Sequence, residues 1–415
     1  HHLKPSQLAP FRVIGDDLSD NALDILKIKR EENAYDALIE YISKPEEEQA
    51  SQAPRLLYDQ MMRVPEWVDW DQICRGQQVL WKYFFPITFV SCYSSFVYTL
   101  GSPATGKVIS SAGYILSPDM LERLIETSQF NVDISTSLEN LKPGKGDGWK
   151  AILQARFLHS HVRMRLQRLG KAHSKYYDIE KYGVAINQED LMVVLIGIAS
   201  FTWTIMEQKL GTPMSEAEKD DYLHLWRYIG FLMGCSEETL AFIPTVQKAD
   251  AIRQSLMLHV VDIDASSAKL VSKAFKYIVA QPIFSLSIDS LGGTCDPLKV
   301  HMALAEHVVG REVWTVLEME PATWAYRIVS QLIFTLFQLE GYLAPICRFW
   351  WDTRKEFITF LHKYLMERIV SRKKIGSSDK SSFEDSHRAM GGTFSMGIMV
   401  FMAILITYSC AFSKI

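Results

Sequence analysis

The chain has 415 residues, of which 48% are hydrophobic and 22% charged, and this apolar content excludes a wholly disordered protein. With 22 glycines and 15 prolines it is not a fibrous or low-complexity protein either. The formal net charge of −4 provides no basic surface for a polyanion, so we expect no nucleic-acid partner. The mean hydropathy is zero, which is high for a soluble enzyme and low for a multi-span membrane protein.

Helical patterns follow one another along the chain, whereas strand signals are weak. Residues 107–114 and 182–186 are candidates for one short strand pair. Ser215 and Glu218 have the spacing of a capping box at a helix start. We therefore predict one large all-α domain over residues 3–370. The expected helices cover residues 22–43, 70–84, 117–130, 149–170, 187–210, 215–233, 248–260, 266–279, 298–309, 322–343 and 354–370.

Three apolar stretches within this domain are predicted to be buried helices and not membrane spans. Residues 83–106 are uncharged but contain two prolines and several serines, and residues 191–206 are bordered by carboxylates. Residues 322–351 include two arginines and a glutamate. A span requires about 20 predominantly apolar residues. The prolines and serines of 83–106, the 16-residue length of 191–206 and the charges within 322–351 therefore favour buried helices.

The apolar run near the C-terminus is different. Residues 390–412 contain no charge over 23 positions, which is long enough to cross roughly 30 Å of hydrocarbon. A polar linker, residues 371–389, precedes it and begins with a basic cluster at 372–374. Because basic residues prefer the cytoplasmic flank, we predict a transmembrane anchor with the body of the protein facing the cytosol. The alternative is a C-terminal helix that packs on the core.

Cysteines and common motifs exclude several familiar sites. The six cysteines are scattered singly, and no CxxC pair suggests a zinc ribbon or a thioredoxin-type site. Residues 3–36 contain no apolar run typical of a signal peptide, so we expect reduced cysteines and contact with the cytosol. We find no P-loop, GxGxxG, HExxH or GxSxG motif.

Two histidines lie together on the predicted helix that begins at residue 149. On a helical wheel, the leucines and valine at 158, 162, 166 and 169 form an apolar stripe roughly 80° wide. His159 lies about 20° outside this stripe, whereas His161 lies about 60° beyond its other edge. An inward neutral imidazole beside Arg156 and Arg163 is typical of a metal ligand near an anion. The alternatives are a core histidine bonded to the backbone, with the arginines at a solvated edge, and His161 as the ligand.

A second group of polar residues lies in the segment RLIET. Arg123, Glu126 and Thr127 are spaced i, i+3 and i+4, so they share one helix face. This face presents a cation, a carboxylate and a hydroxyl together. The alternative is a local ion pair between Arg123 and Glu126 worth about 0.2–1 kcal/mol.

Four segments in order resemble the latex-clearing protein (rubber oxygenase) family, which includes the ER-bound mpaB-type oxygenases. They are RLIET, RFLHSHVR, YGVAINQEDLMVVLIGIASF and EAEKDDYLHLWRYIGFLMG, within residues 70–258. The resemblance implies a globin-like all-α fold that binds haem b and cleaves carbon–carbon double bonds with O₂. His224, in YLHLWR, is expected to make a structural hydrogen bond.

The resemblance also implies roles for individual residues. His159 matches the proximal iron ligand, and Arg123 and Thr127 match distal residues of the family's RxxKT motif. Glu126 stands where rubber oxygenases have a lysine that caps the iron, so a weak ligand or a base replaces that cap here. With haem in place, Arg156 and Arg163 would hold its propionates.

Taken together, the sequence predicts a haem b-dependent oxygenase that acts on a prenyl, terpenoid or lipid-like alkene. The predicted anchor places it in a membrane, and the mpaB-type relatives imply the endoplasmic reticulum. Two alternatives stay open: a haem peroxidase or peroxygenase that uses H₂O₂, and a non-catalytic membrane-tethered protein that binds lipid.

Overall fold

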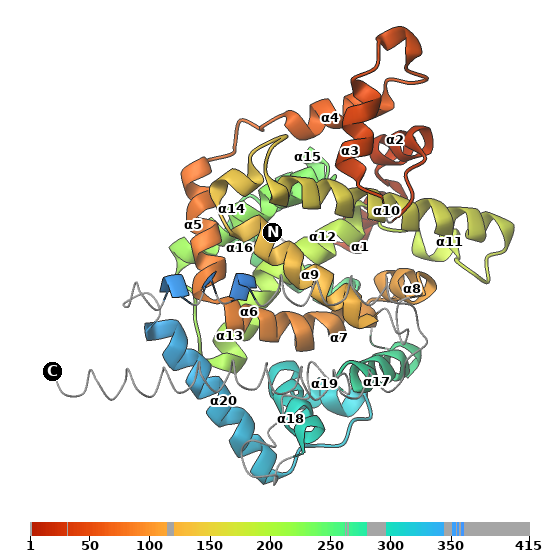
Figure 1. Ribbon diagram of the computed structural model, residues 1–415. Helices are drawn as coiled ribbons and strands as arrows, with labels where there is room; N and C mark the ends of the chain where they lie inside the picture. The colour runs from red at the N-terminus through yellow and green to blue at the C-terminus, as the bar shows by residue number, and fades with distance from the viewer. Residues whose placement is uncertain are drawn as a thin grey trace, which may run out of the picture.

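The computed structural model describes residues 2–113, 120–279, 296–343 and 351–360, apart from residues 31, 262, 264, 354 and 357. Within these ranges all regular secondary structure is helical, which confirms the predicted all-α class (Figure 1). The predicted strand pair is wrong, because residue 107 lies in helix α8 (Pro103–Ser111) and residue 182 ends helix α11 (Ile179–Tyr182). The predicted linker 371–389 and anchor 390–412 lie outside the described residues, as does most of the expected helix 354–370.

The N-terminal helices differ from the single helix predicted over residues 22–43. Helix α2 (Asp17–Leu26) ends at Lys27, whose φ of 52° is left-handed and breaks the helix. A new helix, α3 (Ala34–Ile42), begins after Asn33, whose side chain accepts hydrogen bonds from two backbone N–H groups. With α4 (Ala53–Met62), these helices form the red-to-orange lobe in Figure 1, and α2 and α3 pack on α10 (Asp147–Ala172).

Helices α5 (Trp70–Lys82) and α14 (Glu216–Leu232) form a closely packed pair. A Cβ atom at Gly76 would lie 2.5 Å from the carbonyl oxygen of Asp221, so glycine allows the two backbones to approach. Arg75 also pairs with Asp221, with 3.0 Å between Nε and Oδ2. The predicted capping box is confirmed, because Ser215 Oγ accepts from the N–H of Glu218 and the carboxylate of Glu218 accepts from the N–H of Ser215.

Two long apolar helices each contain a π-helical segment. The first consists of α6 (Phe84–Phe89), a π segment (Val90–Ser95) and α7 (Phe96–Gly101). The second consists of α12 (Gln188–Ile196), a π segment (Gly197–Phe201) and α13 (Thr202–Leu210). Both are long and apolar enough to cross a membrane, but 72% of the second is buried inside the protein. This burial agrees with the prediction of a core helix.

The two π segments contact each other, and the first also packs on α18 (Pro297–Val309). There the buried Tyr93 hydroxyl lies 2.6 Å from Nδ1 of His301. The remaining helices complete the shell, with α17 to α20 on one side of the body (Figure 1). They are α1 (Pro5–Leu8), α9 (Met120–Ser135), α15 (Glu237–Ala241), α16 (Val246–His259), α17 (Ala265–Val279), α19 (Arg311–Val316) and α20 (Trp324–Leu343).

Candidate functional site

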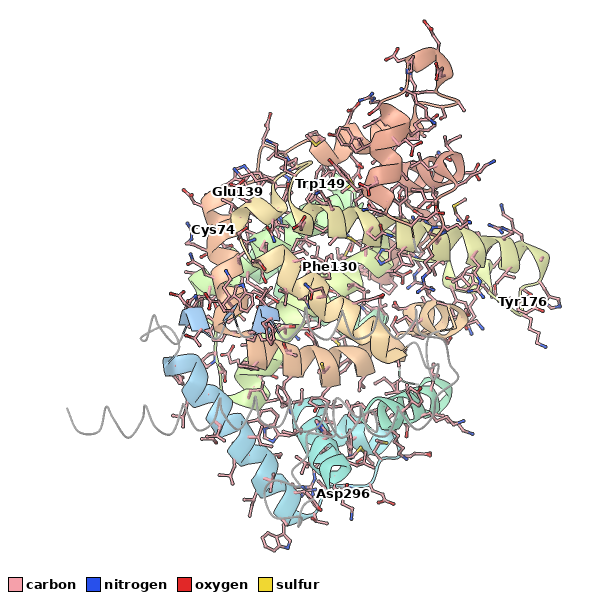
Figure 2. All side chains as sticks on the ribbon, viewed as in Figure 1. Cys74, Phe130, Glu139, Trp149, Tyr176 and Asp296 are labelled. Atoms are coloured by element: carbon pink, nitrogen blue, oxygen red, sulfur yellow. The ribbon has the colours of Figure 1, made fainter. Side chains whose placement is uncertain are left out.

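The predicted site residues lie on two neighbouring helices, α9 and α10. The helices pack together and are joined by a connection that includes a 3₁₀ turn (Leu138–Leu141). Near this closed end, a Cβ atom at Gly148 would lie 2.8 Å from the carbonyl oxygen of Asp133. Figure 2 labels Phe130 on α9 and Trp149 at the start of α10. The Trp149 indole is fully buried and donates to the carbonyl oxygen of Met61 at 3.1 Å, which fixes the start of α10 in the core.

The two predicted groups lie at equal sequence distances from the ends of α9 and α10 that are connected. Arg123 lies twelve residues before the last residue of α9, and His159 lies twelve residues after the first residue of α10. At 1.5 Å per residue, both are about 18 Å along their helices from the closed end. The RLIET segment and His159 therefore lie on two packed helices, at similar distances along each from their connection.

His159 has a buried ring nitrogen without a hydrogen-bond partner, a property it shares among the described residues with side chains such as Ser94, Tyr222 and Tyr228. Nδ1 is inaccessible to solvent and makes no hydrogen bond within the described residues. Burial, with a smaller contribution from the charge of Arg163, lowers the pKa of His159 from 6.5 to about 4. At neutral pH the imidazole is therefore uncharged, and a ring nitrogen retains a lone pair for a metal ion. A buried group left unpaired costs roughly 1–3 kcal/mol, which coordination would offset.

Arg156 and Arg163, on the same helix, have many partners. Arg156 forms a two-point ion pair with Asp16, at 2.7 and 3.0 Å, and also donates to Gln60 Oε1 at 2.8 Å and to the carbonyl oxygen of Leu232 at 3.2 Å. Arg163 forms a similar pair with Asp20, at 2.7 and 2.8 Å. Both arginine side chains are only 1% exposed. Their role toward haem propionates stays a prediction. The described contacts show that both arginines connect α10 to the start of α2 through ion pairs.

The buried arginines also correct the predicted orientation of α10. Leu166 is fully buried, but Leu158 and Val162 of the predicted apolar stripe are only half-buried. The most buried face instead carries Arg156, Arg163 and Trp149. The solvated-edge alternative for the arginines is therefore wrong, because the aspartates of α2 neutralise them inside the core.

Asp16 is held in the charged form by this arrangement. Burial alone would raise its pKa, but the ion pair with Arg156 outweighs burial and leaves the pKa below its usual value. Gly234, at φ +92°, lies against the pair, and a Cβ there would be 2.4 Å from Asp16 Oδ2. A network of this kind is stable only while each charged member keeps its partner.

On the α9 side, Glu126 is half-buried and Thr127 is exposed, and both make interactions within the structure. The side chain of Arg123 lies outside the described part of the chain. The predicted catalytic roles of these three residues therefore stay predictions. His161, the alternative ligand, is half-buried and also interacts with neighbouring groups.

The INQED segment, residues 186–190, forms a buried polar turn at the start of α12. Asn187 caps α12 by accepting from the N–H of Asp190 at 2.9 Å, and Asp190 in turn accepts from the N–H of Asn187. Thr105 of α8 donates to Asp190 at 3.1 Å. Burial raises the pKa of Asp190 from 3.8 to about 6. Glu189 pairs with Arg12 at 2.6 Å, so this turn ties α12 to the N-terminal segment.

His224 has the structural role expected for it. Its Nε2 accepts a hydrogen bond from the N–H of Asp69 at 3.0 Å, and its ring packs edge-on against Trp67. Among the described residues, no group of three or more histidine, cysteine or carboxylate side chains gathers to hold a metal ion. Cys74, Cys92 and Cys235 are free thiols.

Sequence reasoning missed the carboxylates that hold α10. Asp16 and Asp20 flank the first turn of α2, and Asp16 caps that helix through the N–H of Ser19. Their acidic spacing was visible, but the partners lie about 140 residues away in the chain. Because such pairing depends on the tertiary fold, local sequence patterns could not reveal it.

Comparison with known proteins shows the family to which this chain belongs. The sequence model described as "ER-bound oxygenase mpaB/B'/Rubber oxygenase, catalytic domain" matches residues 81–337, which is more than half of the chain. The chain belongs to this family. The match contains both α9 and α10, and it confirms the resemblance seen in the sequence.

Individual relatives agree with the family. The chain is 25% identical to the rubber oxygenase of Streptomyces sp. (strain K30) over 273 residues, which are 65% of this chain and 61% of that protein. The fold is also similar to that reported as "Structure of Latex Clearing Protein LCP in the closed state". The TM-score is 0.60 at 18% identity, and the match covers 80% of this chain and 84% of that chain.

Proposed function

We propose that this protein is a haem b-dependent oxygenase that uses O₂ to cleave or oxygenate a carbon–carbon double bond in a prenyl, terpenoid or lipid-like substrate. The observation that carries the proposal is the orphaned, uncharged His159 on a helix that lies within the matched family region. His159 would hold the haem iron, and haem held by one histidine would supply the activation of O₂. The family supports an oxygenase, and its relatives support an alkene as substrate.

Within this proposal, the protein groups have separate tasks. His159 would hold the iron, and its lowered pKa keeps the ring unprotonated at neutral pH. Arg123 would donate hydrogen bonds to negative charge that develops during the reaction. Thr127 orients Arg123 or the substrate, and Glu126 accepts or returns a proton. Arg156 and Arg163 fix α10 through Asp16 and Asp20, so that the position of His159 is set before any cofactor arrives.

The proposal also includes the location of the protein at a membrane. Residues 390–412 would anchor the chain in the membrane of the endoplasmic reticulum, with the helical domain 3–370 on the cytosolic side and 371–389 as the linker. A greasy alkene partitions into lipid, so an enzyme held at the membrane meets its substrate there. The description of the family as ER-bound supports this placement.

The test is product analysis with labelled oxygen. Haem-loaded protein is incubated with ¹⁸O₂ and a small set of prenyl and terpenoid alkenes, and the products are read by mass spectrometry. We expect carbonyl products that carry ¹⁸O, formed without added H₂O₂. Activity that requires H₂O₂ would instead support the peroxygenase alternative.

Variants on α9 separate catalysis from passive lipid binding. Arg123→Ala and Glu126→Gln are expected to lower turnover while the haem absorbance stays at the wild-type level. A protein that binds lipid without catalysis would show no turnover in any form, and haem-loaded protein inactive toward every alkene would count against the oxygenase.

A further inference from the structure

Helix α20 exposes an apolar face that the described protein leaves uncovered. Its inward side is buried through Phe334, which packs against Phe89 of α6 at 5.8 Å between ring centroids. The outward side repeats with the helical period and is apolar at most positions. Its exposed apolar residues are Trp324 (76% exposed), Ile328 (52%), Leu332 (58%), Leu336 (37%), Leu339 (51%) and Tyr342 (62%).

This face is long and nearly free of charge. The 20 residues of α20 include two charged side chains, Arg327 and Glu340. Figure 1 shows α20 at the outer edge of the body, where it packs on α18. Scattered exposed leucines are ordinary on soluble proteins, but a continuous stripe on one helix marks a binding surface. Among the described helices, α20 is not one of the two long and apolar enough to cross a membrane.

A cationic groove runs beside the stripe. It has a volume of about 430 Å³ and is lined in part by Lys209, Arg311, Arg327 and His307. The one carboxylate in its lining, Glu306, is 5% exposed and already pairs with Arg327 at 2.8 Å and with Arg311 at 3.6 Å. Its other oxygen accepts from the N–H of Ala322 at 2.6 Å. The groove therefore presents a net positive charge along one edge of an apolar helix.

We propose that α20 lies in the surface of an anionic membrane, with its apolar stripe among the acyl chains and the Lys209–Arg311–Arg327 groove on lipid headgroups. Apolar residues on one face with cations at its border are the pattern of interfacial helices. Attraction of the groove's basic residues to anionic lipid adds to the burial of apolar area. An apolar stripe alone could equally bind a protein partner. The adjoining cations favour a membrane, because they can bind the phosphates of lipid headgroups. This contact is separate from the anchor proposed above and does not require the oxygenase reaction.

Hydroxyl-radical footprinting of the full-length chain tests the proposal, because it reports the exposure of individual side chains. Trp324 and Tyr342 are followed with no vesicles, with phosphatidylcholine vesicles and with vesicles that contain phosphatidylserine. Tyr176, 56% exposed at the far tip of the molecule, is the internal control (Figure 2). We expect phosphatidylserine vesicles to slow oxidation of Trp324 and Tyr342 at least about threefold, and to leave Tyr176 unchanged.

Two variant sets assign this protection to the stripe and to the groove. Ile328→Glu/Leu332→Glu should abolish it, whereas Leu258→Glu, at a 73% exposed position on α16, should preserve it. Lys209→Gln/Arg311→Gln should make the protection in phosphatidylserine no greater than in phosphatidylcholine. Equal oxidation with and without vesicles would overturn the proposal. Slow oxidation of Trp324 and Tyr342 relative to Tyr176 in the absence of vesicles would also overturn the proposal. Another part of the chain or a second copy would then cover the stripe.

Discussion

Helix α10 carries two kinds of buried polar residue, and the difference between them separates structure from function. Arg156 and Arg163 each meet an aspartate in two-point contact and also donate to carbonyl oxygens. His159 lies between them in sequence, yet its buried Nδ1 has no partner within the described residues. Each side-chain nitrogen of the arginines therefore has a hydrogen-bond partner, whereas Nδ1 of His159 has none in the described part of the chain. A buried polar atom without a partner calls for an explanation, and under the proposed function the explanation for His159 is a bound metal.

Among the proposed variants, we expect the largest loss of unfolding free energy when Arg156 is replaced. Arg156→Met would leave Asp16 charged, buried and without its partner, which costs about 3–5 kcal/mol of unfolding free energy. Urea denaturation of the two proteins measures this difference. Arg63→Met, which breaks a pair whose side chains are 52% and 63% exposed, is the matched control and should cost no more than about 1 kcal/mol. Equal losses in the two variants would show that the buried network is not special.

Gly234→Ala tests the same network from its neighbour. The new Cβ would clash with Asp16 Oδ2, and φ of +92° is strained for any residue with a side chain. We expect a loss of about 1–3 kcal/mol in the same denaturation experiment. Gly113→Ala, also at positive φ but with open space around it, carries the backbone strain without the clash and should cost less. An equal cost at both positions would remove the clash from the explanation.

Asp190 is expected to make a smaller contribution to the free energy of unfolding, and this contribution depends on pH. Burial raises its pKa from 3.8 to about 6, so between these values the folded state holds a proton that the unfolded chain releases. Stability should therefore fall as the pH rises from about 4 to about 6, and this contribution should be level above that range. Asp190→Asn should remove this part of the pH dependence in thermal unfolding curves. A wild-type slope preserved in the variant would assign the dependence to other groups.

Much of the fold could be predicted from local pattern. The periodicity of residues 149–170 and 215–233 located α10 and α14 to within two residues, and the Ser215 box was confirmed. The end of α2 at Lys27 was not predicted. Glycine is the usual sign of a left-handed residue that ends a helix, and a lysine in that conformation gives no such sign. The strand prediction failed at α8, where β-branched residues occur in a helix held by tertiary contacts.

The site could be predicted only in part. His159 and the RLIET segment were predicted from helix periodicity and from family-like motifs, and their roles stay predictions. The ion pairs of Arg156 and Arg163 could not be foreseen, since they depend on aspartates contributed by a distant helix. The apolar face of α20 was likewise read as core, because a hydrophobic helix pattern does not show which of its faces the fold covers.

The most direct test of the central claim is a pyridine haemochrome spectrum of His159→Ala beside wild type and His161→Ala. The account predicts haem b in wild type and in His161→Ala, and its loss in His159→Ala without the loss of stability expected for Arg156→Met. Haem retained in full by His159→Ala, or lost only in His161→Ala, would contradict the assignment of His159 as the ligand.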